Sequence, residues 1–442
     1  MKYFLPTLGT ASAVALFAFA SSHTADAKPR DTKADTFQQL ELFADVLARV
    51  RNDYVVDVDD GDMINDAING MLQSLDPHSS YVPPEEFMKL QESTSGEYGG
   101  LGMEVTSEDG VVKVIAPIDG SPAKRQGVLA GDYITEVDGE TILGLALNEA
   151  VEKMRGKPGE PITITVVRMD EDPMEIEMVR EIIKRPPVVA EIKDGMGYLR
   201  IGQFNEKTND SLKAGVKQLK KDFGGRIPGV VLDLRGNPGG LLDQSIKVSS
   251  AFLDGGEVVS TRGRAPEDTD SYNADRGELL EGVPVVVLID NASASASEIV
   301  AGAIQDRGRG LVIGRKSFGK GSVQSVIPLR GGRDGALRLT TQRYYTPSGA
   351  SIQGMGITPD IYISAVPDDG RESKRRRESD LPNSIRNEAF DALEESQRDG
   401  EDEPVIEYPP EDYDVENDYQ LQRAIEILKD GSYAQKLAAV EG

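Results

Sequence analysis

The sequence predicts an α/β core that carries an inserted β-rich domain and helical segments at both ends. Between residues 197 and 345, strand-like and helix-like segments alternate, which is typical of an α/β domain with crossover connections. The segments GVVLDLR and PVVVLID are almost continuously apolar, as expected of strands that a parallel sheet buries on both faces. Residues 97–180 instead show short strands separated by glycine turns.

The beginning of the chain predicts export. With 442 residues the chain is long enough for two or three domains. It starts with Lys2 and a short apolar run that ends in Ala25-Asp26-Ala27, the pattern of a secretory signal cleaved after Ala27. We therefore expect the mature protein in a bacterial periplasm. A retained, membrane-associated anchor is the alternative.

The composition excludes several kinds of chemistry. The chain has no cysteine, which excludes thiol catalysis, and only two histidines, His23 in the predicted signal and His78. A histidine-based metal cluster is therefore excluded, and we expect neither a metal nor another cofactor. The formal net charge of −26 opposes binding to nucleic acid.

The remaining elements follow from local patterns. Apolar residues at helical spacing over residues 35–75 predict two helices with a loop at residues 57–62, followed by a proline-rich connector. GMEVTSEDGVVKVIAP predicts two strands around an Asp109-Gly110 turn, and ALNEAVEKM predicts a helix. Near the C-terminus, the acidic stretch 388–418 predicts poor order, and DYQLQRAIEILKDGSYAQKLAA predicts an amphipathic helix.

Two turns that follow buried strands are candidate site loops, because open α/β sheets hold sites where strands end. They are GNPGG and NASASAS, and the second places Ser293, Ser295 and Ser297 ahead of the helix-like SEIVAGAIQD. One interpretation is structural, since Ser295 and Glu298 match a capping box. The other makes a serine the nucleophile, beside helix N–H groups that can stabilise an oxyanion.

A serine nucleophile needs a base, and His78 lies in the distant connector. The candidate is Lys320, which two glycines flank in KSFGKGSVQ. Burial favours the neutral amine that a base requires, whereas a solvated lysine is the alternative. Gln324 would lie about 13 Å from Lys320 in a straight strand, so an orienting contact requires this segment to curl.

SASASEIVAGAIQD followed by GKGSVQ resembles the carboxyl-terminal processing proteases, a family of Ser-Lys serine peptidases. The resemblance covers roughly residues 37–365 and implies an α/β protease core of the crotonase/ClpP-like kind. It also implies three roles in catalysis. Ser295 would be the nucleophile, Lys320 the base and Gln324 the residue that orients the lysine.

The stretch LDLRGNPGGLL is similar to the part of the family that helps to build the oxyanion hole. The resemblance places this role on the backbone N–H of Gly239, with Gly240 as the alternative, together with the N–H of Ala296. The implied boundaries are a signal peptide at 1–27, an N-terminal helical region at 28–90, a PDZ domain at 91–182, the protease core at 183–365 and an acidic tail at 366–442.

The β-rich region also has a physical signature of a PDZ domain. A glycine loop before a strand exposes consecutive N–H groups to a peptide carboxylate, and the strand edge can pair with the peptide backbone. The residues in these positions are Gly100, Leu101, Gly102 and Met103. An ordinary glycine turn is the alternative. The resemblance makes Arg155 a candidate for gating by the PDZ domain, and a solvated arginine is the alternative there.

We therefore expect an exported serine endopeptidase that recognises polypeptides by their free, apolar C-termini and cleaves them through an acyl-enzyme on Ser295. Its substrates would be periplasmic or envelope proteins. A non-catalytic PDZ scaffold, and an acyl-transfer or hydratase enzyme on a related fold, are the alternatives. The residues do not decide whether an activating lipoprotein or adaptor is needed, or whether the chain forms a homo-oligomer.

Overall fold

The computed structural model describes residues 32–441 except 170, 185, 368–375, 388–404 and 415. The predicted signal peptide and the first part of the acidic stretch lie outside the described residues. The chain divides into two compact units, Met1–Asp66 and Ala67–Gly442. In the described part of the chain, no helix combines the length and the apolar character needed to cross a membrane.

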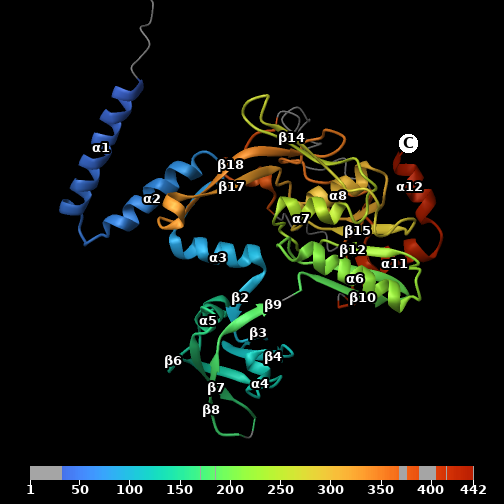
Figure 1. Ribbon diagram of the computed structural model, residues 1–442, viewed down its shortest axis with the longest axis horizontal. Coiled ribbons are helices and arrows are strands. Elements are labelled where there is room, and N and C mark those ends of the chain that lie inside the picture. The colour runs from blue at the N-terminus through green and yellow to red at the C-terminus, as the bar shows by residue number, and fades with distance from the viewer. Residues whose placement is uncertain are drawn as a thin grey trace, which may run out of the picture. The chain divides into compact units, whose positions relative to one another are not determined.

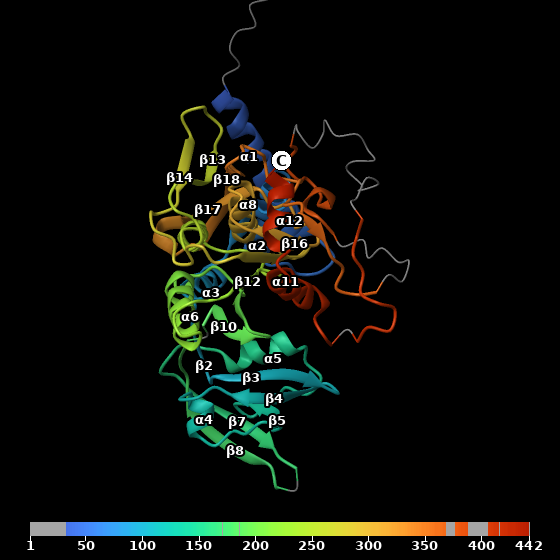
Figure 2. The same cartoon turned by 90° about the vertical axis from the view of Figure 1, so that its right-hand side faces the viewer.

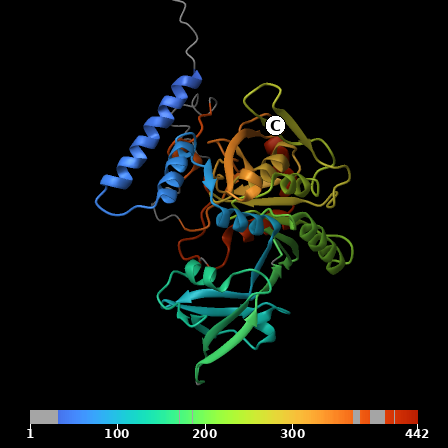
Figure 3. The same cartoon turned by 60° about the vertical axis from the view of Figure 1, so that its left-hand side comes forward.

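The first unit consists of α1 (Thr32–Asp53), a continuous helix in Figure 3, and the start of α2 (Asp60–Gln73). The prediction of two helices is confirmed, although α2 begins inside the predicted loop. Acidic residues lie in its first turn, where the helix dipole favours negative charge. Along α1, apolar side chains such as Phe37 and Leu40 are exposed.

The β-rich region forms a sheet in the order β3-β4-β5-β7-β8, with β6 paired to β5 (Figure 2). Its elements are β3 (Met103–Glu108), β4 (Val111–Pro117), α4 (Pro122–Arg125), β5 (Tyr133–Val137), β6 (Glu140–Thr141), α5 (Leu147–Met154), β7 (Pro161–Val167) and β8 (Met174–Val179). Asp109 and Gly110 both adopt positive φ, as expected of a tight turn between β3 and β4. Ile134 and Ile164 are fully buried, so this region has a hydrophobic core of its own.

A six-stranded sheet forms the centre of the α/β core (Figure 1). Its strands, in spatial order, are β10 (Val188–Lys193), β11 (Met196–Ile201), β12 (Val230–Asp233), β15 (Val285–Ile289), β16 (Leu311–Gly314) and β19 (Ile361–Tyr362). All neighbours from β11 to β19 are parallel, which confirms the predicted crossover topology. The crossover helices are α6 (Thr208–Asp222), α7 (Leu242–Ser249) and α8 (Ala296–Asp306).

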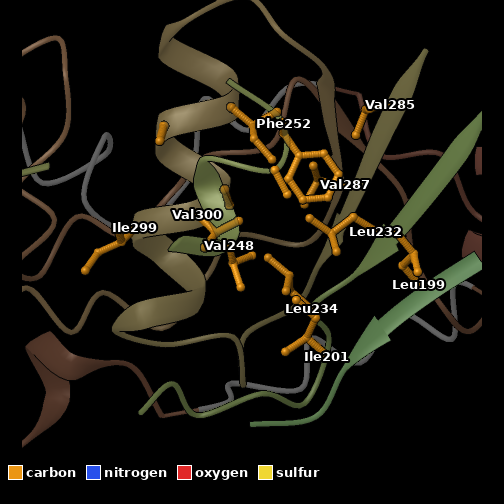
Figure 4. Close-up of a cluster of buried hydrophobic side chains, with 14 of the residues drawn as sticks. Leu199, Ile201, Leu232, Leu234, Val248, Phe252, Val285, Val287, Ile299 and Val300 are labelled. Carbon is orange, nitrogen blue, oxygen red and sulfur yellow. The ribbon is translucent and has the colours of Figure 1, made fainter. Parts of the chain in front are cut away.

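The central strands β12, β15 and β16 are buried on both faces of this sheet. On one face, Leu232 and Val287 pack with Val248 of α7 and Val300 of α8, as Figure 4 shows. On the other face, alternate strand residues pack against α11 (Tyr419–Lys429) and α12 (Tyr433–Glu441). The continuous apolar strands are thus confirmed. The single tail helix that the sequence predicts is instead divided into α11 and α12 around Gly431, which adopts a positive φ, and these two helices complete the core.

A second sheet, in the order β1-β18-β13-β14 with β17 paired to β18, positions the lysine segment. Its strands are β1 (Ser80–Val82), β13 (Glu257–Arg262), β14 (Thr269–Asn273), β17 (Ser322–Pro328) and β18 (Ala336–Tyr345). Lys320 lies in the loop between β16 and β17. The other described elements are α3 (Pro84–Ser95), the pair β2 (Glu97–Gly100) and β9 (Glu181–Lys184), and the 3-10 turns η1 (Leu329–Gly332) and η2 (Glu378–Asp380).

Candidate active site

The two candidate loops meet at one edge of the six-stranded sheet. Since β12 and β15 are adjacent and parallel, the loops that follow them, residues 235–240 and 290–295, leave the sheet on the same side. The backbone N–H of Ala294 donates to the carbonyl oxygen of Asn237 over 3.0 Å. The glycine turn and the serine turn therefore form one site.

Hydrogen bonds distinguish the three serines. The Ser293 hydroxyl donates to the carbonyl of Leu234 over 2.9 Å, and the Ser297 hydroxyl donates to the carbonyl of Asn237 over 3.0 Å. Both serines are fully buried, and these two hydrogen bonds join the serine turn to the glycine turn and the strand end before it. Within the described residues, the Ser295 hydroxyl has no hydrogen-bond partner. Ser295 is thus the one of the three whose oxygen is available for attack.

The backbone of Ser295 is strained. As the N-cap of α8 it adopts φ 56° and ψ −113°, a conformation that costs a non-glycine residue about 1–3 kcal/mol. Glu298, at the third helical position, accepts the Ser295 N–H over 2.7 Å, whereas the Ser295 hydroxyl does not cap the helix. The capping interpretation therefore holds for Glu298 and not for the hydroxyl.

The carboxylate of Glu298 joins the serine turn to the lysine loop. Its Oε2 accepts the backbone N–H groups of Ser295 (2.7 Å) and Lys320 (2.9 Å). Its Oε1 accepts the Gly319 N–H and the Ser317 hydroxyl, each over 2.6 Å. Glu298 is fully buried, and burial raises its pKa to about 7 against the opposing effect of these four donors.

The lysine loop has a fixed backbone, because every N–H from residue 317 to residue 321 has an acceptor. The acceptors are, in chain order, the Ile357 carbonyl, the Ser293 carbonyl, Oε1 and Oε2 of Glu298, and Oε1 of Gln353. A Cβ at Gly321 would lie only 2.2 Å from the backbone nitrogen of Gln353, so this close approach requires glycine.

The Lys320 side chain, in contrast, has a free ammonium, with no hydrogen bond or ion pair in the described residues. Burial lowers the pKa of Lys320 below its usual range, and the positive charge of Arg338 lowers it further. The carboxylates of Glu378, Glu298 and Asp76 act in the opposite direction. A lowered pKa and a free nitrogen suit a general base.

Gln324 does not contact Lys320 in this structure. Its amide donates to the hydroxyl oxygens of Ser322 (2.9 Å) and Thr340 (3.3 Å). The segment is extended in β17, with an irregular register beside Gln324 in place of the curl that the orienting contact requires. The orienting role of Gln324 stays a prediction.

The glycine turn lies against the start of α8. A Cβ at Gly239 would come within 3.0 Å of the Ala296 nitrogen, and the φ of Gly239 is +102°, so both space and conformation require glycine. Its N–H, however, donates to Oδ1 of Asn237 over 2.9 Å. Among the described residues, the N–H groups of Gly240 and Ala296 have no acceptor. In this conformation Gly240, the alternative to Gly239, is the available partner of Ala296.

The β-rich domain carries an apolar groove beside an unpaired strand edge. Strand β3 is the outermost strand of its sheet, and α5 runs alongside it (Figure 2). The groove, of about 360 Å³, is lined by all four predicted loop residues, Gly100, Leu101, Gly102 and Met103, and by apolar side chains that include Val105, Ile115, Val151 and Met154. An open edge with apolar pockets suits an added peptide strand.

Arg155 ends α5 and also lines this groove. Its guanidinium lies 5.0 Å from the ring centre of Tyr98 and forms an ion pair with Glu152 over 3.2 Å. In the described residues these contacts belong to the β-rich region and its entry strand, not to the α/β core. The gating role of Arg155 stays a prediction.

Comparisons with known proteins identify the family and two of its domains. The family model for peptidase family S41 matches residues 195–363, that for the PDZ domain residues 113–168, and that for the activating protease CtpB N-terminal domain residues 8–86. A carboxy-terminal-processing protease of Bartonella bacilliformis is 53% identical over 335 residues, which cover 75% of this chain and 77% of that protein. The chain belongs to the carboxy-terminal-processing proteases. It is a serine-type peptide hydrolase with a PDZ domain.

A second relative and a solved structure share less identity with this chain. A probable CtpA-like serine protease of Staphylococcus aureus is 36% identical over 327 residues, 73% of this chain and 64% of that protein. Among solved structures, a photosystem II D1 C-terminal processing protease is 28% identical, with a TM-score of 0.43, and the match covers 74% of this chain and 94% of that chain.

Sequence reasoning missed how the tail of this S41 protease holds the glycine turn. Arg235 donates to both carboxylate oxygens of Asp418, over 2.7 and 2.6 Å, and to both oxygens of the fully buried Asp233. Asp418 also caps α11 through the N–H of Leu421. No pattern indicates this pair, because 183 residues separate its members.

His78 is bonded to a carboxylate rather than to a serine. Its Nε2 lies 2.8 Å from Oε2 of Glu378, and its backbone N–H donates to Asp76. Neither acidic residue is distinguished by a sequence pattern. Over the described ranges, no cluster of histidine, aspartate and glutamate is suited to hold a metal ion.

Proposed function

We propose that this carboxy-terminal-processing protease is a Ser-Lys endopeptidase in which Ser295 is the nucleophile and Lys320 the general base. One observation carries the proposal. Ser295 alone among the three serines keeps its hydroxyl unbonded, and its backbone N–H shares an oxygen of Glu298 with that of Lys320. The nucleophile and the base thus belong to one fixed unit.

The proposed reaction has two steps. The neutral amine of Lys320 accepts the Ser295 proton as the serine oxygen attacks the scissile carbonyl, and the N–H groups of Gly240 and Ala296 donate to the oxyanion. The ammonium returns the proton to the leaving amine, the C–N bond breaks, and an ester on Ser295 remains. Water then attacks the ester while Lys320 again accepts a proton. The ammonium returns this proton to the Ser295 oxygen as the ester C–O bond breaks, which restores the serine and releases the new C-terminus.

Gln324 can orient Lys320 only if its amide leaves Ser322 and Thr340. We expect this exchange when a substrate is bound. Gln324→Ala should then lower kcat and leave KM unchanged, and a variant with the parental kcat would remove Gln324 from the catalytic set.

For substrates, we propose polypeptides with free, apolar C-termini. The apolar lining of the groove and the unpaired edge of β3 support this choice. The carboxylate would be held by N–H groups of the loop at residues 100–103. Arg155, at the rim of the groove, would sense the occupied state.

We also propose export to the periplasm with cleavage after Ala27, and envelope proteins as substrates. The support is the N-terminal pattern of Lys2, an apolar run and Ala25-Asp26-Ala27. An activating lipoprotein or adaptor, or a second copy of the chain, would act as a partner there. The mass of the protein from a periplasmic extract should fit a chain that begins at Lys28. A mass that includes residues 1–27 would contradict cleavage.

The test is cleavage of an unstructured reporter protein that ends in an apolar tail, a charged tail or an amidated tail. The parent should cleave only the first reporter, and Ser295→Ala should cleave none. Val151→Asp, in the groove, should raise KM for the apolar tail, whereas Val179→Asp, on the exposed face of β8, should not. Cleavage by Ser295→Ala would contradict the nucleophile, and equal cleavage of all tails would contradict the role of the groove.

A further inference from the structure

A short piece of the tail lies against the lysine loop. Residues 376–387 follow the part of the chain that the S41 model matches, residues 195–363. The backbone N–H of Glu378 donates to the carbonyl of Phe318 over 3.1 Å, two residues before Lys320. Glu378 itself is fully buried. A buried carboxylate is costly unless donors and positive charges surround it, so its position requires an explanation.

The carboxylate of Glu378 bridges two other segments. Its Oε2 pairs with Nε2 of His78 over 2.8 Å, and its Oε1 accepts the amide of Gln353 over 3.0 Å. Gln353 is fully buried as well, and its own Oε1 accepts the N–H of Gly321 over 3.0 Å. The lysine loop is therefore tied to Glu378 on both sides of Lys320.

Other bonds fix the same piece of chain. The Asn387 amide donates to the carbonyl of Gln353 over 2.6 Å, and the Asn383 amide donates to the carbonyl of Gln73 over 2.9 Å. Residues 376–387 thus connect the end of α2, the His78 connector and the lysine loop. We call these residues the strap.

We propose that the strap forms part of the active site and that Glu378 is a positioning residue for Lys320. The inference rests on the proposed function, because it assigns Glu378 to the base of that mechanism. An apolar side chain or an amide would anchor the strap at lower cost than a buried carboxylate. What the carboxylate adds is a negative charge near an ammonium that has no ion pair of its own in the described residues.

The charged groups around Lys320 and Glu378 determine what the experiment measures. Arg338 of β18, Glu298 of α8, Asp76 of the connector and Glu378 of the strap act on Lys320, and His78 faces Glu378. A carboxylate stabilises the ammonium form, so its removal lowers the pKa of the lysine. Activity rises as the lysine loses its proton, so this rise then occurs at lower pH. Loss of an anchor alone would not change the pH at which activity rises.

The experiment measures kcat and KM against pH, with a reporter that carries the apolar tail. Glu378→Gln should leave KM unchanged and shift the rise of kcat with pH, which the parent shows above pH 7, to lower pH. Glu378→Ala should in addition lower kcat at least tenfold. Glu411→Gln is the control, since it removes an exposed carboxylate from the tail outside the strap and should change neither the pH dependence nor kcat. Urea unfolding of each variant separates lost stability from lost function.

If the Glu378→Gln variant is folded and shows the pH dependence and kcat of the parent, the proposal is overturned and the strap is only a structural anchor. The imidazole of His78 is bonded directly to the Glu378 carboxylate, so removal of this carboxylate also changes the surroundings of the imidazole. The same shift should therefore occur in a His78→Gln background, and its absence there would also overturn the proposal. Ser295→Ala and Lys320→Ala are measured in parallel. Activity of Ser295→Ala or of Lys320→Ala would contradict the proposed function. If both are inactive while Glu378→Gln behaves like the parent, only the role of Glu378 is contradicted.

Discussion

Glu298 accepts the backbone N–H of Lys320 over 2.9 Å, although 22 residues separate them in the chain. The same oxygen accepts the N–H of Ser295, so one buried carboxylate sets the relative position of the proposed nucleophile and base. Because all four contacts to Glu298 are donors, the site requires an acceptor on both carboxylate oxygens.

Glu298→Gln should damage both stability and catalysis. A glutamine has one acceptor oxygen, so two of the four buried donors lose their partner. We expect a loss of about 2–4 kcal/mol in the free energy of unfolding and a fall in kcat of roughly a hundredfold from misplacement of the base. Urea unfolding and reporter cleavage measure these effects. Glu149→Gln, which changes the exposed residue at the equivalent position of α5, is the control and should retain the parental kcat. A parental kcat in Glu298→Gln would show that the bridge is not needed.

The strain at Ser295 predicts an unusual stability order. Ser295→Gly and Ser295→Ala should both be inactive, but glycine tolerates a φ of 56° whereas alanine does not. The glycine variant should therefore be more stable than the alanine variant by about 1–2 kcal/mol. Thermal or urea unfolding of the two proteins makes the comparison. Equal stability would mean that the backbone stores no strain at this position.

The lowered pKa of Lys320 fixes the direction of the pH dependence. In the proposed mechanism the neutral amine is the base, so kcat/KM should rise with pH as the ammonium loses its proton, with a midpoint below the ordinary lysine value of 10.5. Burial raises the pKa of Glu298 to about 7, so this carboxylate titrates around neutral pH and the rise at more alkaline pH belongs to Lys320. Lys320→Arg should be inactive at every pH, because a guanidinium stays protonated. A flat profile above pH 7, or an active arginine variant, would exclude lysine as the base.

Asp418→Asn tests the contact between the tail and the glycine turn. Asparagine still caps α11 but withdraws the charged partner of Arg235. We expect the free energy of unfolding to fall by about 1–3 kcal/mol, with a lower kcat because Arg235 precedes the glycines that are proposed to build the oxyanion hole. Asp430→Asn, at the exposed end of the same helix, is the control. An unchanged kcat would limit Asp418 to a structural role.

Local patterns predicted the elements of the fold and the loops of the site. Alternating strands and helices, and the apolar runs around Val231 and Val286, indicated the sheet because burial on both faces leaves a direct compositional trace. The serine turn and the lysine loop could be found for the same reason, since each follows a strand that can be recognised. The free hydroxyl of Ser295 could not be predicted, because it depends on where the neighbouring serines find acceptors.

The contacts that organise the site were beyond the reach of pattern reasoning. Glu378 lies in a charged stretch that indicates a solvated tail, yet it is fully buried beside the lysine loop. Gln324 was expected at Lys320, whereas its amide is bonded to Ser322 and Thr340. Both outcomes depend on side chains that meet only in the folded chain, and neither a period nor a spacing encodes such pairings.

The most direct measurement compares reporter cleavage by the parent, Ser295→Ala and Ser297→Ala. Ser297 is the matched control because it lies two residues after the proposed nucleophile and its hydroxyl is bonded to the Asn237 carbonyl. The account predicts no cleavage by Ser295→Ala and retained turnover by Ser297→Ala. Cleavage by Ser295→Ala, together with its loss in Ser297→Ala, would contradict the assignment of the nucleophile.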